Sequence, residues 1–358
     1  MKILFYVGYQ KKPWNGNTEE GLAGSEIAVI NIAENLALYG YKIVVSGNVK
    51  NAKNIRGVEY CDLDRIHDLH GNTFDILVGT SYAHFGMEFF SYTKAKKIFW
   101  AHNTEAFSWY NGTKLSEDNV QKILSQDEQF IDYTVTLTSW HSDKWSKKYN
   151  WPASNQIKIG NGINTSSFVG HPTKNKNSFI WSSAIDRDLV ELLKNWPRIK
   201  GVLADATLNV YWPEYSSKFS QMQWIEENKK HLEPLGVTFH GPVSQVVLHR
   251  AMLESDFWCY VTNYEETYCI TALEMQYARV LPIVTKVAAL KETVHSGIIL
   301  ENDETKWDKL VETLRVLSPS LKTFAKEKAH KWAKRQTWSE RASDWREFFL
   351  KAVDNKLQ

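Results

Sequence analysis

The sequence alternates short apolar runs with helical stretches, and it does so in two series. The first series contains β-forming runs at residues 2–7, 42–46, 75–79, 96–100 and 133–138. After a polar stretch at 173–178, which resembles a linker, a second series contains runs at 178–182, 207–211, 237–239, 257–261 and 281–284. This alternation predicts an α/β protein of two Rossmann-like domains, each a parallel sheet covered by helices.

Helical spacing fills the segments between these runs. A helix is expected from Gly24 to Gly40, where Gly40 can adopt the left-handed conformation that ends a helix. Further helices are expected near 187–195, 218–231, 243–255 and 268–279, and an amphipathic helix from Trp338 to Lys351. Open α/β sheets bind ligands beyond the carboxyl ends of their strands, so two such domains predict a ligand in a central cleft.

Composition narrows the class of protein. The 43 basic and 41 acidic residues leave a formal charge of +2, which argues against a nucleic-acid partner. The apolar start is too short for a signal peptide, and no apolar run is long enough to span a membrane, so a cytoplasmic protein is expected. Cys61, Cys259 and Cys269 lack the number and spacing of a disulfide framework or a zinc site. The 15 Trp and 16 Tyr fit either stacking on sugars and nucleobases or ordinary cores.

A loop ending in Gly24 and Ser25 directly precedes the first long helix. Small residues let backbone N–H groups approach an anion, and a helix N-terminus carries a partial positive charge, so this position suits a diphosphate. The alternative is a helix start capped by Gly24 or Ser25 with no ligand.

The segment from Tyr264 to Glu274 lies between a predicted strand and a predicted helix. Glu266 falls where the loop meets the helix and Glu274 two turns later, so both carboxylates can share one helix face, separated by about 12 Å along the axis. One ligand could span them, because carboxylates accept hydrogen bonds from sugar and ribose hydroxyls. The alternative is a pair of solvated carboxylates, although the apolar residues around them indicate a mostly buried helix, where an unpaired charge is costly.

Four features occur in the order found in the family 4 glycosyltransferases of GT-B fold, and the sequence resembles that family over most of its length. They are the glycine loop at 24–26, the turn Ile159-Gly-Asn-Gly-Ile-Asn-Thr165, the Glu266-x7-Glu274 helix followed by 276–285, and the closing helix that starts at Trp338. The resemblance implies an N-terminal acceptor-side domain at 1–168, a nucleotide-sugar-binding domain at 169–337, and a helix at 338–358 that crosses back to the first domain.

The activity implied by this resemblance is that of a retaining hexosyl- or pentosyltransferase. The donor would be a UDP- or GDP-linked sugar, the acceptor a glycan or lipid-linked glycan, and no metal or other cofactor would be required. Catalysis would be chiefly electrostatic, with front-side attack in which a donor phosphate oxygen takes the acceptor proton.

The resemblance also implies roles for individual residues. Glu274 is similar to the residue that holds the ribose hydroxyls, and Glu266 to the one that contacts donor-sugar hydroxyls. Backbone N–H groups of the loop 267–269 would face sugar and phosphate, through Thr267, Tyr268 and Cys269. His102 occupies the position of a histidine that faces the donor sugar, although a lone histidine after a strand is more commonly a loop or core residue.

The family usually balances the diphosphate with an Arg and a Lys after the first strand of the second domain. Here Arg187 matches the Lys position and Ser182 occupies the Arg position, so one cation is missing, and Ser183 with a helix N-terminus could help. The alternative for Arg187 is a surface ion pair with Asp186 or Glu191. After the strand at 237–239, Gly241 lies where the family places the nucleobase.

Two further motifs have plainer interpretations. Asp62 and Asp64 form a D-x-D pair like that of metal-dependent transferases of another fold, and we interpret it as a solvated loop. The segment 140–151 mixes aromatic and basic residues, which suits a core-facing stripe with a solvated basic face, or peripheral contact with a membrane or an acceptor glycan.

Two other activities remain open at the level of sequence. One is another GT-B-shaped enzyme, such as a sugar-nucleotide epimerase or a phosphorylase. The other is a catalytically inactive scaffold that binds glycans or assembles with partners, an alternative that Ser182 in place of the usual Arg keeps open.

Overall fold

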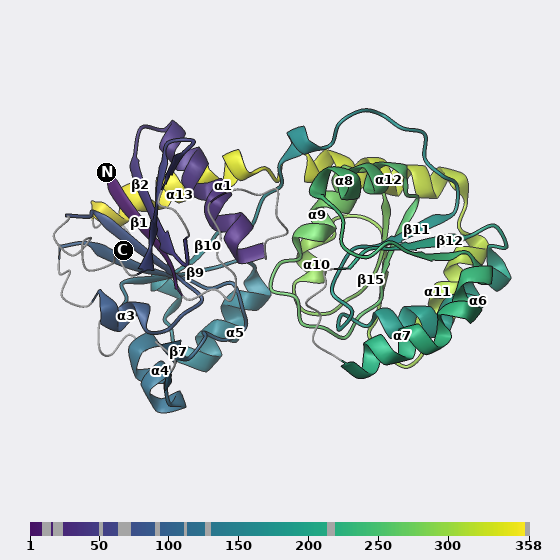
Figure 1. The fold of residues 1–358 in the computed structure, drawn as a ribbon, viewed down its shortest axis with the longest axis horizontal. Coiled ribbons are helices and arrows are strands. Elements are labelled where there is room, and N and C mark those ends of the chain that lie inside the picture. The colour runs from purple at the N-terminus through teal and green to yellow at the C-terminus, as the bar shows by residue number, and fades with distance from the viewer. Residues whose placement is uncertain are drawn as a thin grey trace. The chain divides into compact units, whose positions relative to one another are not determined.

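The computed structural model describes residues 1–8, 16, 24–49, 53–63, 73–89, 94–110, 113–125, 130–212 and 219–354. The chain forms two compact units. Unit 1 comprises Met1–Gly162 with Trp338–Gln358, and unit 2 comprises Ile163–Thr337. In Figure 1 unit 1 carries the N-terminal strands and the C-terminal helix, and unit 2 carries the helices and strands between them.

Unit 1 is built on an eight-stranded sheet in its described residues, with the order β10-β9-β6-β5-β1-β2-β4-β3. The strands are parallel except for β3, which runs antiparallel to β4. The strands are β1 (Lys2–Gly8), β2 (Lys42–Gly47), β3 (Lys53–Ile55), β4 (Val58–Asp62), β5 (Ile76–Thr80), β6 (Lys96–Trp100), β9 (Tyr133–Thr136) and β10 (Gln156–Lys158), with a separate hairpin of β7 (Trp109–Tyr110) and β8 (Thr113–Lys114).

Helices cover both faces of this sheet (Figure 1). Successive side chains along a strand point to opposite faces, so each strand packs against both layers of helices. Leu4 and Tyr6 of β1 pack on the face covered by α3, α4 and α5, whereas Phe5 contacts Trp100, which contacts Trp345 of α13 on the other face. Helix α13 also packs against α1. The helices are α1 (Gly24–Leu38), α3 (Phe85–Glu88), α4 (Glu117–Leu124), α5 (Ser139–Tyr149) and α13 (Trp338–Val353), with a 3₁₀ turn η2 (Ala153–Asn155).

Unit 2 contains a six-stranded, fully parallel sheet in its described residues, with the order β13-β12-β11-β14-β15-β16. Its strands are β11 (Ser178–Trp181), β12 (Thr207–Val210), β13 (Val237–Phe239), β14 (Phe257–Tyr260), β15 (Leu281–Thr285) and β16 (Ile298–Leu300). All four residues of β11 and of β14 are buried, as expected for central strands with helices on both faces.

The helices of unit 2 form two layers, with α6, α7 and α11 on one face of the sheet and α8, α9 and α12 on the other (Figure 1). They are α6 (Leu189–Val202), α7 (Phe219–Leu232), α8 (Gln245–Glu254), α9 (Ile270–Tyr277), α10 (Leu290–Thr293), α11 (Lys306–Val316) and α12 (Pro319–Ala333), with 3₁₀ turns η3 (Thr165–Ser167) and η4 (Glu233–Leu235).

The two-series prediction is confirmed: each predicted strand is present, with bounds that differ by at most two residues. The prediction of a linker at 173–178 is wrong. Lys174 Nζ donates to the carbonyl oxygens of Met252 (3.2 Å) and Ala278 (2.7 Å), and the backbone N–H of Asn177 donates to Asp256 Oδ2 (3.0 Å). Although Thr173, Asn175 and Lys176 are exposed, Lys174 and the backbone of Asn177 thus fix this stretch to unit 2, which a linker would not do.

The aromatic residues mostly serve the cores. Trp100, Trp145, Trp181, Trp196 and Trp258 are all fully buried. In the segment 140–151 the buried ring of Trp145 stacks on Phe99, so the core-facing interpretation of that segment is confirmed. Among the described residues, no helix has the length and apolar character needed to cross a membrane.

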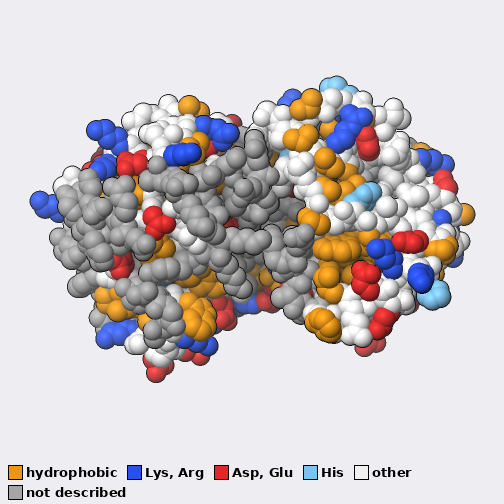
Figure 2. All heavy atoms as spheres, in the orientation of Figure 1, with side chains coloured by type: hydrophobic (Ala, Val, Ile, Leu, Met, Phe, Trp, Pro, Cys, Tyr) orange, Lys and Arg blue, Asp and Glu red, His pale blue; other side chains and the backbone are white. Residues whose placement is uncertain are grey.

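Charged side chains are intermixed on the surface. Figure 2 shows lysines and arginines interspersed with aspartates and glutamates over the described part of the face in view. This distribution matches the small formal charge of +2.

Candidate functional site

Arg187 lies in the loop that connects β11 to α6 in unit 2. Its Nη1 is 2.7 Å from Asp186 Oδ1, its Nε is 3.7 Å from Glu266 Oε1, and its guanidinium carbon lies 3.4 Å from the centre of the Tyr264 ring. Burial acts to lower the pKa of Arg187, but the negative groups around it together raise that pKa. The ion pair with Asp186 that the alternative interpretation expects is thus present, together with a contact to Glu266.

Glu266 is a half-buried carboxylate in the loop after β14. Tyr260, at the end of β14, donates a hydrogen bond of 2.6 Å to Glu266 Oε1. Burial raises the pKa of Glu266, while the bond from Tyr260 and the charge of Arg187 oppose the rise. Both contacts are made to Oε1, so within the described residues Oε2 is left to accept a hydrogen bond from a ligand.

The helix that follows Glu266 begins later than the sequence predicts. Cys269 adopts a left-handed backbone conformation (φ 65°, ψ 81°), and α9 starts only at Ile270. Glu266 therefore belongs to the loop, and the expectation that it shares a helix face with Glu274 is wrong. A non-glycine residue at positive φ interrupts the helical hydrogen-bond pattern, which leaves Thr267 and Tyr268 in the loop as well.

Glu274 lies on α9 and contacts a histidine that sequence reasoning missed. His249 Nε2, on α8, is 3.4 Å from Glu274 Oε1, and both side chains are largely buried. The His249 ring stacks on Phe168 with centroids 4.2 Å apart. No sequence signal marks His249, because its proximity to Glu274 arises only from the packing of α8 on α9.

Cys269 directly precedes α9 and lies between Glu266 and Glu274 in the chain. Burial raises the pKa of the Cys269 thiol, and the charges of Glu266 and Glu274 raise it further while Arg187 opposes them. The structure places Arg187 in contact with Glu266 before α9, whereas Glu274 within α9 contacts His249.

Asp188 holds the two loops of this site against each other, and it is also absent from the sequence prediction. Its Oδ2 accepts hydrogen bonds from Asn263 N (2.6 Å), Asn263 Nδ2 (3.2 Å) and Thr262 Oγ1 (3.2 Å). Asp188 itself has a left-handed backbone (φ 71°), a strained conformation for a non-glycine residue. The carboxylate therefore ties the loop that carries Arg187 to the loop that carries Tyr264 and Glu266.

The two serines after β11 lie beside this cluster in sequence. The carbonyl oxygen of Ser183 accepts a 2.7 Å hydrogen bond from Trp181 Nε1, which fixes the first turn of the loop. The Ser182 hydroxyl is buried and has no hydrogen-bond partner among the described residues. Ser182 therefore supplies no charge where the resemblance would place a second cation.

Gly241 follows β13 with a φ of +67°, a conformation that glycine adopts without strain. A Cβ atom at this position would meet nothing within 4 Å. The preceding residue, His240, stacks on Tyr211 with ring centroids 4.4 Å apart and bonds Asn209 Oδ1 at 2.8 Å. The backbone around Gly241 is therefore anchored and sterically open.

The remaining predicted residues belong to unit 1. His102 follows β6, is buried, and lies with its ring 4.4 Å from that of Trp100. Burial, and then the charge of His141, lower the pKa of His102 to about 3, so the ring is neutral at neutral pH. Gly24 is the first residue of α1, and the Ser25 hydroxyl lies 3.1 Å from Glu26 Oε2. The loop before Gly24 lies outside the described residues.

The D-x-D pair lies only partly within the described residues. Asp62 is the last residue of β4, and Asp64 lies outside the described residues. Where side chains are described, no group of three or more His, Cys, Asp or Glu residues could hold a metal ion. The three cysteines are free thiols.

Solved structures share this architecture over nearly the whole chain. A glycosyltransferase from Rickettsia africae superposes with a TM-score of 0.75 at 14% identity, covering 99% of each chain. Anabaena Alr3699/HepE, solved in complex with UDP-glucose, has a TM-score of 0.73 at 14% identity, covering 98% of this chain and 100% of its own. A sucrose-phosphate synthase from Thermosynechococcus elongatus has a TM-score of 0.70 at 10% identity, covering 99% and 100%.

These likenesses establish the fold, which is the GT-B fold of two Rossmann-like units. No protein-family model matches the sequence, and no curated protein sequence matches it.

Proposed function

We propose that this protein is a glycosyltransferase that moves a hexosyl or pentosyl group from a UDP- or GDP-linked sugar to a glycan or lipid-linked glycan. The carrying observation is the contact of Arg187 with Glu266 in the loop before α9, the helix that carries Glu274. The GT-B fold supports the proposal, since one structural neighbour is solved with UDP-glucose. The likeness to family 4 glycosyltransferases further implies a retaining, metal-independent reaction.

In this proposal unit 2 binds the donor. Glu274, supported by His249, accepts hydrogen bonds from the two ribose hydroxyls, and Glu266 accepts one from a donor-sugar hydroxyl. Backbone N–H groups at the start of α9 approach the diphosphate, where the helix contributes partial positive charge. Gly241 lies beside the nucleobase, as the resemblance implies, and the space around its Cα is open.

Catalysis in this proposal is electrostatic. Arg187 and the N-terminus of α9 stabilise the negative charge that develops on the leaving diphosphate as the bond to the anomeric carbon breaks. Glu266 pairs with Arg187 in the free protein, and donation from a sugar hydroxyl to Glu266 frees the guanidinium for phosphate. In unit 1, the proposal assigns the neutral ring of His102 to the donor sugar. It assigns Gly24 and Ser25, at the start of α1, to the diphosphate.

Two variants test this assignment. Arg187→Ala is expected to slow turnover by about 100-fold, the order found on removing one group that stabilises a developing oxyanion, with little change in nucleotide affinity. Glu274→Ala is expected mainly to weaken binding of the nucleoside diphosphate, measured by calorimetry with UDP and GDP. Arg198→Ala and Glu312→Ala remove exposed charges of α6 and α11 and serve as controls.

The donor and the stereochemistry have direct assays. The correct nucleoside diphosphate at 100 times its dissociation constant should add about 2.7 kcal/mol to the free energy of unfolding. Turnover should survive a chelator, and NMR of the product should show the anomeric configuration of the donor. Unchanged binding and turnover in both the Arg187 and the Glu274 variants would refute the donor site.

The missing cation at Ser182 supports one competing function, a GT-B scaffold that binds nucleotide and glycan without transfer. Its buried, unpaired hydroxyl offers no charge to a leaving diphosphate. Nucleotide binding without donor turnover across an acceptor panel would favour this scaffold. Release of free nucleoside diphosphate only when an acceptor is added would instead support glycosyl transfer and argue against a sugar-nucleotide epimerase.

A further inference from the structure

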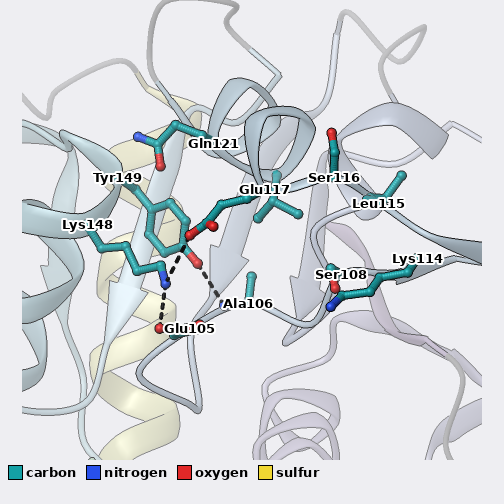
Figure 3. Close-up of a pocket in the computed structure, with 11 residues that line it drawn as sticks. Glu105, Ala106, Ser108, Lys114, Leu115, Ser116, Glu117, Gln121, Lys148 and Tyr149 are labelled. Carbon is teal, nitrogen blue, oxygen red and sulfur yellow. Dashed lines mark hydrogen bonds and ion pairs between the residues drawn. The ribbon is translucent and has the colours of Figure 1, made fainter.

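Unit 1 contains a pocket of about 470 Å³ between the segment after β6, helix α4 and the last turn of α5 (Figure 3). This volume is in the range of sites for small ligands. About half of its wall is polar, with contributions from Glu105, Ser108, Glu117, Gln121, Lys148 and Tyr149. None of these residues takes part in the donor site proposed above.

The charges on the wall balance. Glu105 and Glu117 oppose Lys148 and Lys114, all of which line the pocket. Lys148 Nζ is 2.5 Å from Glu105 Oε1 and 4.0 Å from Glu117 Oε1, on one side of the pocket in Figure 3. An anion would meet the two carboxylates and a cation the two ammonium groups, so an uncharged ligand is favoured.

Carboxylate and ammonium groups side by side match one chemical class of uncharged ligand. Each hydroxyl of a polyol can donate to a carboxylate and accept from a neighbouring ammonium group, and vicinal hydroxyls can bridge such a pair. Tyr149 adds a donor. Its hydroxyl oxygen accepts a 3.0 Å hydrogen bond from Ala106 N, and burial raises its pKa to about 12, so it keeps its proton at neutral pH.

The wall that carries Ser108 is held in place before any ligand binds. Phe107 N donates to the carbonyl oxygen of Ser81 (2.6 Å), Ala83 N donates to that of Phe107 (3.0 Å), and Leu115 N donates to that of Ser108 (2.7 Å). Such preorganisation reduces the entropy lost on binding.

Two exposed aromatic side chains flank Ser108 in the sequence. Phe107 is 44% exposed and Trp109 is 55% exposed, unlike the many tryptophans of the cores. Neither ring lines the pocket, so the preference for a saccharide over a lipid chain rests on the polar side chains of its wall.

We propose that this pocket binds an uncharged saccharide unit of the acceptor. The inference rests on the proposed function, which requires an acceptor but does not say where its sugar units bind.

The test uses the full chain and uncharged trisaccharides: maltotriose, cellotriose, chitotriose and mannotriose. Calorimetry with each should identify at least one ligand of the wild type. Lys148→Gln and Glu117→Gln should each weaken its binding by about tenfold, the effect of losing one charge-assisted hydrogen bond. The matched controls Lys147→Gln and Asp118→Asn, at neighbouring positions on α5 and α4 outside the pocket, should bind like the wild type.

Binding of UDP and GDP, measured on the same variants, separates this inference from the proposed function. Unchanged nucleotide affinity with weakened trisaccharide affinity supports the pocket. Failure of the wild type to bind any of the four trisaccharides, or equal affinity in pocket and control variants, overturns it. Binding to phosphatidylglycerol vesicles that is lost in the pocket variants would likewise overturn it in favour of a lipid surface. Failure of the wild type to bind UDP or GDP, with trisaccharide affinity weakened only in the pocket variants, would count against the donor site and support the pocket.

Discussion

At the scale of single residues, the donor-site candidates are held in place by neighbouring side chains. Arg187 is fixed by the ring of Tyr264 and by two carboxylates, and Glu274 by His249. Asp188 accepts three hydrogen bonds while its own backbone stays in the left-handed region. Strained residues persist where their surroundings overdetermine them, and they are common at functional sites.

Asp188→Ala is therefore expected to lower the free energy of unfolding by about 2 kcal/mol, the value typical for hydrogen bonds to a charged group. It should also weaken nucleotide binding, because the loop of Arg187 loses its tie to the loop of Glu266. Urea denaturation and calorimetry with UDP and GDP measure the two effects. Asp188→Asn, which tolerates the left-handed backbone and keeps an oxygen acceptor, is the control. Equal stability of the Ala variant and the wild type would contradict the structural role.

At the scale of elements, a polar cluster joins the segment before β11 to helix α12. Asp256, which precedes β14, is paired with Lys322 and Lys326 of α12, and its carboxylate also accepts from Asn177 N. Lys174 lies beside this cluster and bonds two carbonyl oxygens. The cluster fixes the entry of the chain into the sheet, which is why the polar stretch 173–178 is not a linker.

This cluster makes stability depend on pH. Burial lowers the pKa of Lys174 to about 7, and the charges of Lys326 and Arg279 add to this effect, whereas the charge of Asp256 opposes it. An unfolded lysine titrates near 10.4. Between these values the unfolded chain binds more protons, so the contribution of Lys174 to the free energy of unfolding rises with pH, by at most about 1.4 kcal/mol per unit. Below pH 7 Lys174 is protonated in both states, so its unfavourable contribution to the free energy of unfolding no longer changes with pH.

Urea denaturation of the wild type and of Lys174→Met at pH 7, 8 and 9 measures this slope. The wild type should gain stability with pH relative to the variant, and the comparison of slopes cancels the cost of leaving two carbonyl groups without a donor. Lys176→Met, an exposed position on the same segment, should behave like the wild type. Parallel pH profiles for Lys174→Met and the wild type would refute the assignment.

At the scale of the whole molecule, the two units differ in how the chain builds them. Unit 2 is one continuous stretch, whereas unit 1 needs the C-terminal residues 338–358 to complete it. Trp345 of α13 is fully buried, with its ring 4.8 Å from that of Trp100 and 5.2 Å from that of Phe349. The last helix therefore closes one face of a core whose first strand is at the other end of the chain.

Trp345→Ala is expected to destabilise unit 1 by about 3–5 kcal/mol, the usual cost of emptying a buried aromatic site. Hydrogen exchange should accelerate in β1 and β6 and stay unchanged in β11 and β14. Trp332→Ala, which removes a half-buried ring stacked on His295 in unit 2, is the control and should leave unit 1 unaffected. Equal protection of β6 in the variant and the wild type would contradict this prediction.

The sequence by itself predicted ten strands in order and several of the helices between them, because periodicity and turn residues act over a few neighbours. It placed β1, β11 and β14 within two residues, and it singled out Arg187, Glu266 and Glu274. It missed the late start of α9, because the left-handed Cys269 follows from the site around it and not from local propensity. It also missed α12. Two lysines of this helix pair with Asp256, and that contact is not evident from the local sequence.

Only the tertiary structure decided which side chains meet. His249 reaches Glu274 across two helices, Asp188 reaches Asn263 from 75 residues away, and Tyr149 meets Ala106 across 43 residues. Such contacts depend on how helices and strands pack, and packing reflects the combined burial of many distant residues rather than any local pattern. The fold class can thus be predicted from the local spacing of apolar and turn residues. The partners that orient the charged side chains depend on contacts between residues far apart in the sequence.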